Sequence, residues 1–326
     1  MSKLVTIYGG SGFVGRYIAQ RMARAGWRVR VAVRRPNEAL FVRTYGVVGQ
    51  VDPVLANIRN EASVAQAMQG ADAVVNCVGT FDKGGKNNFG AVQHEGAERI
   101  ARLAAAQGVE TLVHISAIGA DTNGDSLYAQ SKGRGEEAIL RHFPNAVILR
   151  PSVVFGAEDQ FFNRFAGMTR LSPVLSVVGA ETKFQPVFVD DVAAAAERGA
   201  TGKAKPGIYE LGGPEVKSFR ELMQMMLTVI QRRRLILNLP FGLARFMAWW
   251  FDLWQSLSGG LIKAPLTVDQ VKNLRHDNVV SEGARGFADL GIEPRAMATV
   301  LPGYLWRFRT SGQYAAIKDS VKNLKA

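Results

Sequence analysis

The sequence predicts an α/β protein with a doubly wound parallel sheet and a smaller C-terminal α/β appendage. An apolar strand at residues 4–8 runs directly into a glycine-rich turn and a helix. Further apolar runs then alternate with helical patterns as far as residue 156, and this alternation is typical of a parallel sheet. With 47% apolar residues over 326 positions, the chain can bury a large core. These three observations indicate a Rossmann-type architecture.

The first turn carries a Gly-x-x-Gly-x-x-Gly pattern. Gly9 allows the tight turn at the strand end, Gly12 lets the backbone approach a pyrophosphate, and Gly15 lets the helix pack close to the sheet. The helix begins near Phe13 and Val14, and its N-terminus offers free N–H groups to an anion. The pattern predicts dinucleotide binding. The alternative is a purely structural glycine turn.

The second strand, at residues 28–33, ends in Arg34 and Arg35. An acidic residue at this place would hold the ribose hydroxyls of NAD, whereas arginines can pair with the 2′-phosphate of NADP. The two arginines therefore predict NADP(H). The alternative is a solvated basic loop, because Arg43 also lies nearby.

The next two strands continue the alternation of apolar runs and helical patterns. Valines at 47–51 predict a short third strand, and Asn57 and Ile58 lie just beyond it. A helix is expected from about Ser63 to Gln69, with Ser63 as its cap. The fourth strand, at residues 71–79, ends in small residues.

The fourth strand ends at Cys77, Val78 and Gly79, and a polar, glycine-rich loop covers residues 80–90. Such loops lie on the side of a parallel sheet where ligands bind, so this loop is a candidate lid. We expect Cys77 to be a core residue rather than a nucleophile, because no histidine near it in sequence suggests activation.

A helix at about 92–107 leads into the fifth strand at 112–119, which holds Ser116. Tyr128 and Lys132 follow, one helical turn apart, so that the phenol and the ammonium lie on one helix face. A sixth strand at 147–156 contains Pro151.

The glycine spacing and the Tyr-x-x-x-Lys pair resemble the short-chain dehydrogenase/reductase superfamily, in its extended or atypical branch. In that superfamily the lysine lowers the tyrosine pKa, and the tyrosine exchanges a proton while the nicotinamide exchanges hydride. A serine or threonine after the fifth strand orients the substrate oxygen. The corresponding position here falls near Ile118, while Ser116 lies at the strand end. The resemblance therefore implies that Tyr128, Lys132 and Ser116 are vestigial catalytic candidates.

The same resemblance implies a set of cofactor contacts. Asn57 and Ile58 take the place of the residues that meet the adenine, and Tyr128 and Lys132 line the nicotinamide ribose. The remaining members of the set lie at strand ends, namely Cys77, Val78, Gly79, Ser116 and Pro151. Segments 184–192, with Asp190 or Asp191 as a helix cap, and 207–214 resemble later parts of extended members.

Beyond residue 230 the composition changes. Arginines at 232–234 precede an apolar strand, and residues 242–257 are rich in large apolar side chains, namely Phe246, Met247, Trp249, Trp250, Phe251, Leu253 and Trp254. At about 16 residues this segment is shorter than the roughly 20 that span a bilayer. It is expected either to lie in a membrane interface, to meet an apolar partner or to close the core of its own domain.

The last residues mix aromatic and basic side chains, which suits a headgroup region or a partner surface. They are Tyr304, Trp306, Arg307, Phe308, Arg309, Tyr314, Lys318, Lys322 and Lys325, beside a single acid, Asp319. We therefore expect an NADP(H)-binding domain over 1–230, with parts of a substrate-side lobe inserted after 155. Residues 231–326 are expected to face a partner or a membrane.

Composition narrows the remaining possibilities. The net charge is +12, from 40 basic and 28 acidic residues, which suits anionic lipid or an acidic partner. No nucleic-acid-binding motif is present, so we expect no nucleic acid. Cys77 is the single cysteine, and the four histidines form no cluster with it, so we expect neither a disulfide nor a metal site. No signal or transit pattern precedes the first strand, so we expect neither.

Together these motifs resemble the nucleotide-binding accessory subunit of respiratory complex I, the NADH:ubiquinone oxidoreductase of electron transport, and its bacterial relatives. The residues that carry the resemblance are the glycine turn at 8–15 and segments 76–79, 114–116, 128–132, 150–151 and 184–190.

This resemblance implies a tightly held NADPH and a structural, non-catalytic role on the peripheral arm, near the membrane and the quinone. Other complex I subunits would be the partners. The location would be the cytoplasmic face of the bacterial inner membrane, or the matrix side in mitochondria. The alternative is an NADPH-dependent reductase or isomerase that acts on a hydrophobic, quinone- or isoprenoid-like substrate.

Overall fold

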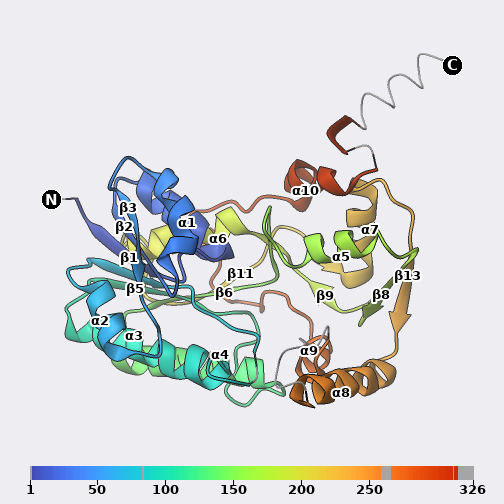
Figure 1. Cartoon of the computed structure of the whole chain (residues 1–326), viewed down its shortest axis with the longest axis horizontal. Helices are drawn as coiled ribbons and strands as arrows, with labels where there is room; N and C mark the ends of the chain where they lie inside the picture. The colour runs from blue at the N-terminus through green and yellow to red at the C-terminus, as the bar shows by residue number, and fades with distance from the viewer. Residues whose placement is uncertain (1, 83, 258–265, 311, 315–326) are drawn as a thin grey trace. The chain divides into compact units, whose positions relative to one another are not determined.

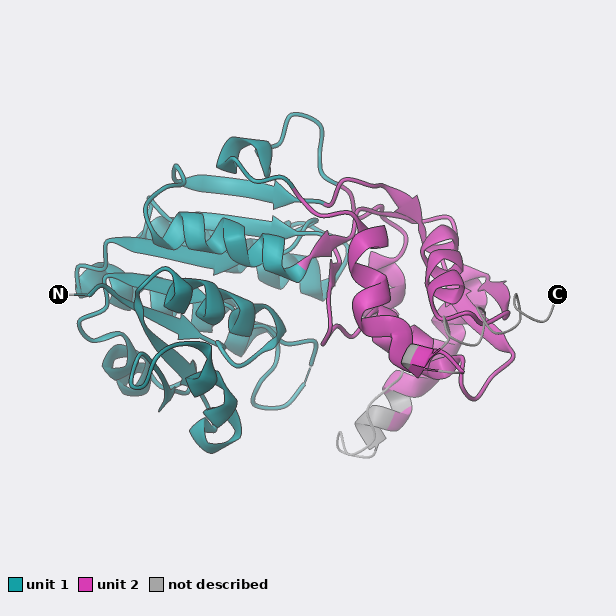
Figure 2. Ribbon diagram, turned by 90° about the horizontal axis from the view of Figure 1, so that it is seen from above, with its two compact units in different colours: residues 1–152, 189–212, 280–293 teal, residues 153–188, 213–279, 294–326 magenta. Residues whose placement is uncertain are grey.

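The computed structural model describes residues 2–82, 84–257, 266–310 and 312–314. The chain divides into two compact units, each made of three segments (Figure 2). Unit 1 comprises residues 1–152, 189–212 and 280–293, and unit 2 comprises 153–188, 213–279 and 294–326. The predicted basic residues Lys318, Lys322 and Lys325, the acid Asp319 and the side chain of Leu253 lie outside the described part.

Unit 1 is built on one seven-stranded sheet in the order β11-β6-β5-β4-β1-β2-β3 (Figure 1). Every neighbouring pair in this sheet is parallel. The predicted doubly wound parallel sheet is therefore confirmed. Its strands are β1 (Leu4–Tyr8), β2 (Arg28–Val33), β3 (Val51–Leu55), β4 (Ala73–Asn76), β5 (Thr111–Ile115), β6 (Val147–Pro151) and β11 (Gly207–Leu211).

Helices cover both faces of this sheet. Figure 1 shows α1 (Phe13–Arg24) and α6 (Val189–Ala200) on one face, and α2 (Glu61–Met68), α3 (Glu95–Ala106) and α4 (Leu127–His142) on the other. A π-helical turn at Gly90–His94 leads into α3, and a 3-10 segment, Pro36–Tyr45, links β2 to β3. One core lies between the second helical layer and the sheet, and it includes Tyr8, Ile100 and Ile139.

Local details of unit 1 differ from three expectations. Val47 and Val48 lie in an exposed turn, and β3 begins only at Val51. Asn60, rather than Ser63, caps α2, and its side chain accepts the Ser63 N–H at 2.9 Å. Helix α6 begins at Val189, so that Asp190 and Asp191 lie in its first turn and do not cap it. Arg21 of α1 pairs with Asp190 there, at 2.7 Å.

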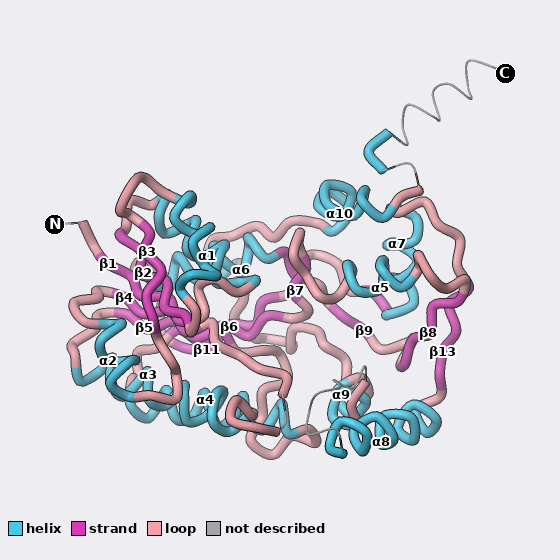
Figure 3. Tube along the Cα trace, viewed as in Figure 1, coloured by secondary structure: helices cyan, strands magenta, loops and turns pink. Residues whose placement is uncertain are grey.

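Unit 2 has short two-stranded sheets around a phenylalanine-rich core (Figure 3). The paired strands are β7 (Val154–Phe155) with β10 (Val187–Phe188), β9 (Lys183–Phe184) with β12 (Lys217–Ser218), and β8 (Val174–Val178) with β13 (Leu235–Leu239). Its helices are α5 (Phe162–Met168), α7 (Phe219–Val229), α8 (Phe241–Leu257), α9 (Val268–Asn273) and α10 (Met297–Leu305). None of the helices in the described ranges is both long and apolar enough to cross a bilayer.

Candidate nucleotide-binding site

Every site residue predicted from the sequence lies in unit 1. These residues follow the carboxyl ends of β1 to β6 or lie on α1 and α4. Strands β1 and β4 are neighbours, and the strand order reverses between them. In parallel α/β sheets, ligands bind outside the carboxyl ends of the strands at this reversal point. The topology thus gathers the predicted residues around one place.

The glycine turn has no room for side chains at its closest approach. Gly9 has a φ of +74°, which is the left-handed region that glycine tolerates. A Cβ placed on Gly15 would lie 2.4 Å from the Gly9 carbonyl oxygen, and one on Gly12 would lie 3.1 Å from the same atom. Gly15 therefore lets α1 pack against the turn, as predicted. Gly12 has no side chain, so none covers the N-terminal end of α1.

The N-terminus of α1 is prepared for an anion. The helix begins at Phe13, with Gly12 as its N-cap, and no side chain caps it. Its first turn contains no acidic residue. The first N–H groups of a helix have no partner within the helix, and they lie at the positive end of its dipole. This end of α1 fits a pyrophosphate.

Arg34 and Arg35 are both exposed just after β2, as predicted, but their surroundings differ. Arg35 donates a hydrogen bond to Glu38 at 2.9 Å, so its charge is partly matched. Arg34 has no hydrogen-bond or ion-pair partner among the described residues. Arg34 is the arginine that remains available to a phosphate at this strand end.

The adenine side is formed after β3. Asn57 is half-buried, and its side-chain oxygen accepts the Arg59 N–H at 3.1 Å. Ile58 is buried against Gly96 of α3, and its carbonyl accepts a hydrogen bond from Arg99 at 2.8 Å. The Asn57 side chain is therefore held in a local turn, while Ile58 belongs mainly to the core.

The exit of β4 lies beside the glycine turn and Lys132. A Cβ on Gly9 would contact the Cys77 carbonyl at 3.2 Å and the Val78 side chain at 3.3 Å. A Cβ on Gly79 would lie 4.0 Å from the Lys132 Nζ. Burial raises the pKa of the Cys77 thiol to about 12, which leaves it protonated and inert near neutral pH.

Tyr128 lies among aromatic rings. Phe81 stacks on it at 5.5 Å with an interplanar angle of 15°, and Phe89 meets it edge-on at 6.0 Å. Burial raises the pKa of the Tyr128 phenol to about 12. The family resemblance implies a lowered pKa, and in this protein the direction is the opposite. The phenol is a hydrogen-bond donor near neutral pH.

Lys132 lies one turn further along α4 and is 6% exposed. Its ammonium donates to the Ile115 carbonyl at 3.1 Å. Burial lowers the pKa of Lys132 from 10.5 to about 8, although Glu136 and Cys77 act in the other direction. Lys132 also helps burial to lower the pKa of His114, which is therefore neutral on β5.

Ser116 is buried at the end of β5 and donates a short hydrogen bond to the Glu136 carboxylate. Glu136 is itself buried on α4 and accepts three further hydrogen bonds from Arg150 of β6, the shortest at 2.6 Å. Arg150 reaches Glu210 of β11 at 3.6 Å as well. The Ser116 hydroxyl is thus joined to a buried ionic network, and Pro151 follows Arg150 at the strand end.

Comparisons with known proteins agree with this geometry. A family model described as NAD(P)H-binding matches residues 9–158. The Arabidopsis thaliana protein called NADH dehydrogenase (ubiquinone) 1 alpha subcomplex subunit 9, mitochondrial, is 32% identical over 316 residues, which cover 95% of this chain and 79% of that protein. The chain belongs to the subunit 9 family.

Two other similarities place this member of the subunit 9 family among related folds. The ceramide reductase of Caulobacter vibrioides is 30% identical over 191 residues, or 59% of each chain. The crystal structure of the Bordetella bronchiseptica enzyme WbmG in complex with NAD has a TM-score of 0.68 at 14% identity, over 94% of both chains. The second similarity shows the fold alone. Residues 9–158 of this subunit 9 relative are an NAD(P)H-binding domain.

Sequence reasoning missed three side chains of this site. Phe81 and Phe89 both lie in the glycine-rich loop at 80–90, and no periodicity marks them as partners of Tyr128. Glu136 could have been found from its spacing in the sequence. It follows Lys132 by four residues, just as Lys132 follows Tyr128, so one face of α4 carries all three side chains.

Proposed function

We propose that this chain is an NADPH-holding accessory subunit of respiratory complex I with a structural rather than a catalytic role. Its place would be the peripheral arm near the membrane and the quinone, on the cytoplasmic face of a bacterial inner membrane or the matrix side in mitochondria. Other complex I subunits would be its partners. Membership of the subunit 9 family supports the assignment to the complex.

One observation carries the non-catalytic part of the proposal, namely the hydrogen bond between Ser116 and Glu136. A reductase of this superfamily needs a hydroxyl that is available to the substrate oxygen. Here the corresponding position falls near Ile118, and the Ser116 hydroxyl at the strand end already donates to a buried carboxylate that Arg150 holds in place. The raised pKa of Tyr128 points the same way, because a general acid is most effective when its pKa lies near the working pH.

NADPH rather than NADH is proposed because of Arg34. This arginine has no partner in the described part of the chain and follows β2, where the adenosine ribose lies in folds of this type. The glycine turn and the bare end of α1 would hold the pyrophosphate. Lys132 and Tyr128 would donate hydrogen bonds to the nicotinamide ribose.

Extraction of the native protein in mild detergent tests the assignment. We expect it to co-purify with complex I subunits, and the complex to release NADPH on denaturation. Recovery of the protein free of complex I subunits would contradict the proposal.

A second function is favoured by two specific observations. Tyr128 and Lys132 lie one turn apart on α4, and one relative is named a ceramide reductase. The alternative is therefore an NADPH-dependent reductase or isomerase acting on a hydrophobic substrate. Substrate-dependent oxidation of NADPH by the isolated protein, abolished by Tyr128→Phe, would favour it over the accessory role.

Residues 231–326 are proposed to form the region that faces a partner or a membrane. Their basic and aromatic composition supports this role, and anionic lipid is the expected surface.

A further inference from the structure

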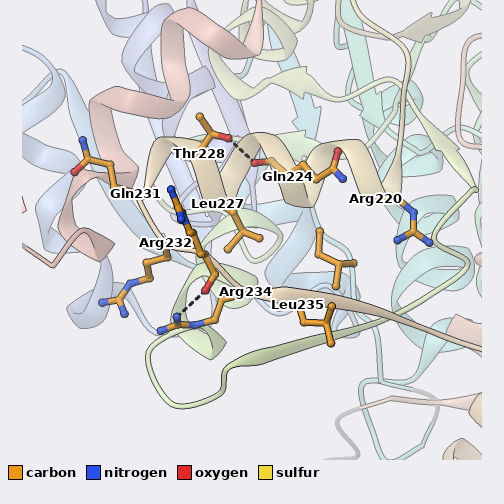
Figure 4. Close-up of a pocket in the computed structure, with 10 residues that line it drawn as sticks. Arg220, Gln224, Leu227, Thr228, Gln231, Arg232, Arg234 and Leu235 are labelled. Atoms are coloured by element: carbon orange, nitrogen blue, oxygen red, sulfur yellow. Dashed lines mark hydrogen bonds between the residues drawn. The ribbon is translucent and has the colours of Figure 1, made fainter.

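A hollow of about 730 Å³ lies in unit 2, at the end of α7 (Figure 4). Its lining comes from α7 and from the segment that leads into β13. Four arginines contribute to it, namely Arg220, Arg232, Arg233 and Arg234. Nothing in the nucleotide-binding site of unit 1 uses these residues.

Three of these arginines are not neutralised. Arg220 pairs with Glu181 at 3.1 Å, whereas no carboxylate in the described ranges pairs with Arg232, Arg233 or Arg234. Three arginines at consecutive positions, all lining one hollow without a paired carboxylate, give it a positive local field. An anion would supply the missing charge.

Backbone carbonyls hold two of these side chains in place. Arg232 Nε donates to the Phe308 carbonyl at 2.9 Å, and Arg234 Nε donates to the Thr169 carbonyl at 3.0 Å. A carbonyl fixes the orientation of a guanidinium without cancelling its charge, and a guanidinium has five N–H donors in all. The hollow therefore presents oriented donors and positive charge together, which is what a phosphate requires.

The backbone that starts this arginine run is strained. Gln231 has a φ of +54°, a left-handed conformation that is uncommon for a residue with a side chain. Its N–H donates to the Thr228 carbonyl, and the Arg232 N–H donates to the Leu227 carbonyl, so the end of α7 is closed by a Schellman motif. Glycine usually occupies this place. Strain of this kind is concentrated at functional sites.

Exposed apolar side chains follow the hollow along the chain. Leu235 and Leu237 of β13 are 66% and 46% exposed. Helix α8 follows after Pro240, and it turns Ala244 and Ala248 inward. Its exposed face carries Leu243, Phe246, Trp249, Trp250 and Trp254.

Small residues inward and tryptophans outward reverse the usual arrangement of a surface helix. Tryptophan is enriched where a membrane meets water, because its ring is apolar and its N–H is polar.

We propose that the arginine hollow binds the phosphate of an anionic phospholipid headgroup, while β13 and α8 lie in the interface of the same membrane. The charge complementarity and the exposed tryptophans together select this occupant over an acidic protein, which would not require so large an apolar face. The inference rests on the proposed function only in placing the chain beside a membrane.

Sedimentation of the purified full chain with lipid vesicles tests this inference. One set of vesicles is phosphatidylcholine alone, and the other contains 30% phosphatidylglycerol. We expect binding to the anionic set only, and weaker binding as salt rises. Arg233→Glu is the informative variant, because the Arg233 side chain makes no hydrogen bond or ion pair within the described residues. It should reduce partitioning at least about tenfold, since each basic residue near an anionic surface contributes a factor of roughly five.

Lys203→Glu, the same charge reversal on an exposed turn of unit 1, is the matched control and should bind like the unmodified protein. Trp250→Ser should weaken vesicle binding while leaving the melting temperature unchanged. Equal binding by Arg233→Glu and Lys203→Glu would overturn the inference. So would an Arg233→Glu variant that binds vesicles normally but no longer co-purifies with complex I, because the hollow would then serve an acidic protein. NADPH content and co-purification of the unmodified protein are measured in the same preparations and test the proposed function separately.

Discussion

Arg34 and Arg35 follow the same strand but differ in their present partners, and this difference leads to a prediction. Arg34→Ala should weaken NADPH binding by roughly 1.5 kcal/mol or more, because a charge-assisted hydrogen bond is lost, and should leave NADH binding nearly unchanged. Arg35→Ala should have the smaller effect, since Glu38 already matches its charge. Titration of both variants with both nucleotides at low salt is the measurement. Equal losses for NADPH and NADH would show that neither arginine meets the 2′-phosphate.

The buried ammonium of Lys132 should lower the stability of the nucleotide-free protein and contribute to nucleotide binding. Burial lowers its pKa from 10.5 to about 8, so the unfolded chain binds more protons between these values and stability rises with pH there. At pH 7 the shift corresponds to roughly 3 kcal/mol of destabilisation. Loss of the Ile115 hydrogen bond would offset about 1 kcal/mol of any gain.

Lys132→Met should therefore stabilise the nucleotide-free protein by about 1 kcal/mol or more at pH 7. The gain should nearly vanish at pH 9.5, where the cost of the pKa shift falls to about 1.4 kcal/mol and the lost hydrogen bond offsets most of it. NADPH affinity should fall. Denaturant unfolding at the two pH values checks this. A variant that is less stable than the unmodified protein at pH 7 would contradict it.

Tyr128→Phe separates the two candidate functions at the level of one hydroxyl. In an accessory subunit the phenol only donates to the ribose, so its loss should cost about 1 kcal/mol of NADPH affinity. NADH:ubiquinone activity of the assembled complex should be nearly unchanged. Loss of that activity in fully assembled, NADPH-loaded complex would argue for a direct role of the tyrosine.

At the scale of one element, the start of α1 provides a matched pair of substitutions. Gly15→Ala would place a Cβ 2.4 Å from a backbone oxygen that cannot move freely. We expect it to lower the free energy of unfolding by about 1–3 kcal/mol. Gly12→Ala has an ordinary φ of −69° and would meet the same oxygen at 3.1 Å, so its stability should fall by less than that of Gly15→Ala. It should instead weaken NADPH and NADH equally, because both share the pyrophosphate. Thermal melts and nucleotide titrations of both variants distinguish these effects.

Individual elements also show which features of the fold could be predicted from the sequence and which could not. Strand β2 has the predicted limits, Arg28–Val33, because its valines alternate with other residues between a tight turn and two arginines, and the alternation stops at both ends. The cap of α2 was predicted wrongly at Ser63, since Asn60 and Ser63 are both good cap residues and only the backbone decides between them. The link from Ser116 to Glu136 joins residues 20 positions apart, and only tertiary packing determines it.

At the scale of the whole molecule, nucleotide and lipid are expected to act on separate units. All predicted cofactor contacts lie in unit 1, and the arginine hollow lies in unit 2. NADPH at a hundredfold excess over its Kd should stabilise the protein by about 2.7 kcal/mol, because it binds only the folded state. Arg233→Glu should show the same increase in melting temperature. A reduced increase in this variant would indicate that the two sites are coupled.

The outward face of α8 has a practical consequence for spectroscopy. Three of the five tryptophans in the chain, Trp249, Trp250 and Trp254, lie on this single helix and are each more than 40% exposed. Indole emission moves to shorter wavelength when the ring leaves water, so the intrinsic fluorescence of the protein is weighted toward the helix proposed to enter the interface. Lipid contact can therefore be followed by emission wavelength without an attached dye, and quenchers placed at known depths in the bilayer can measure how far α8 enters.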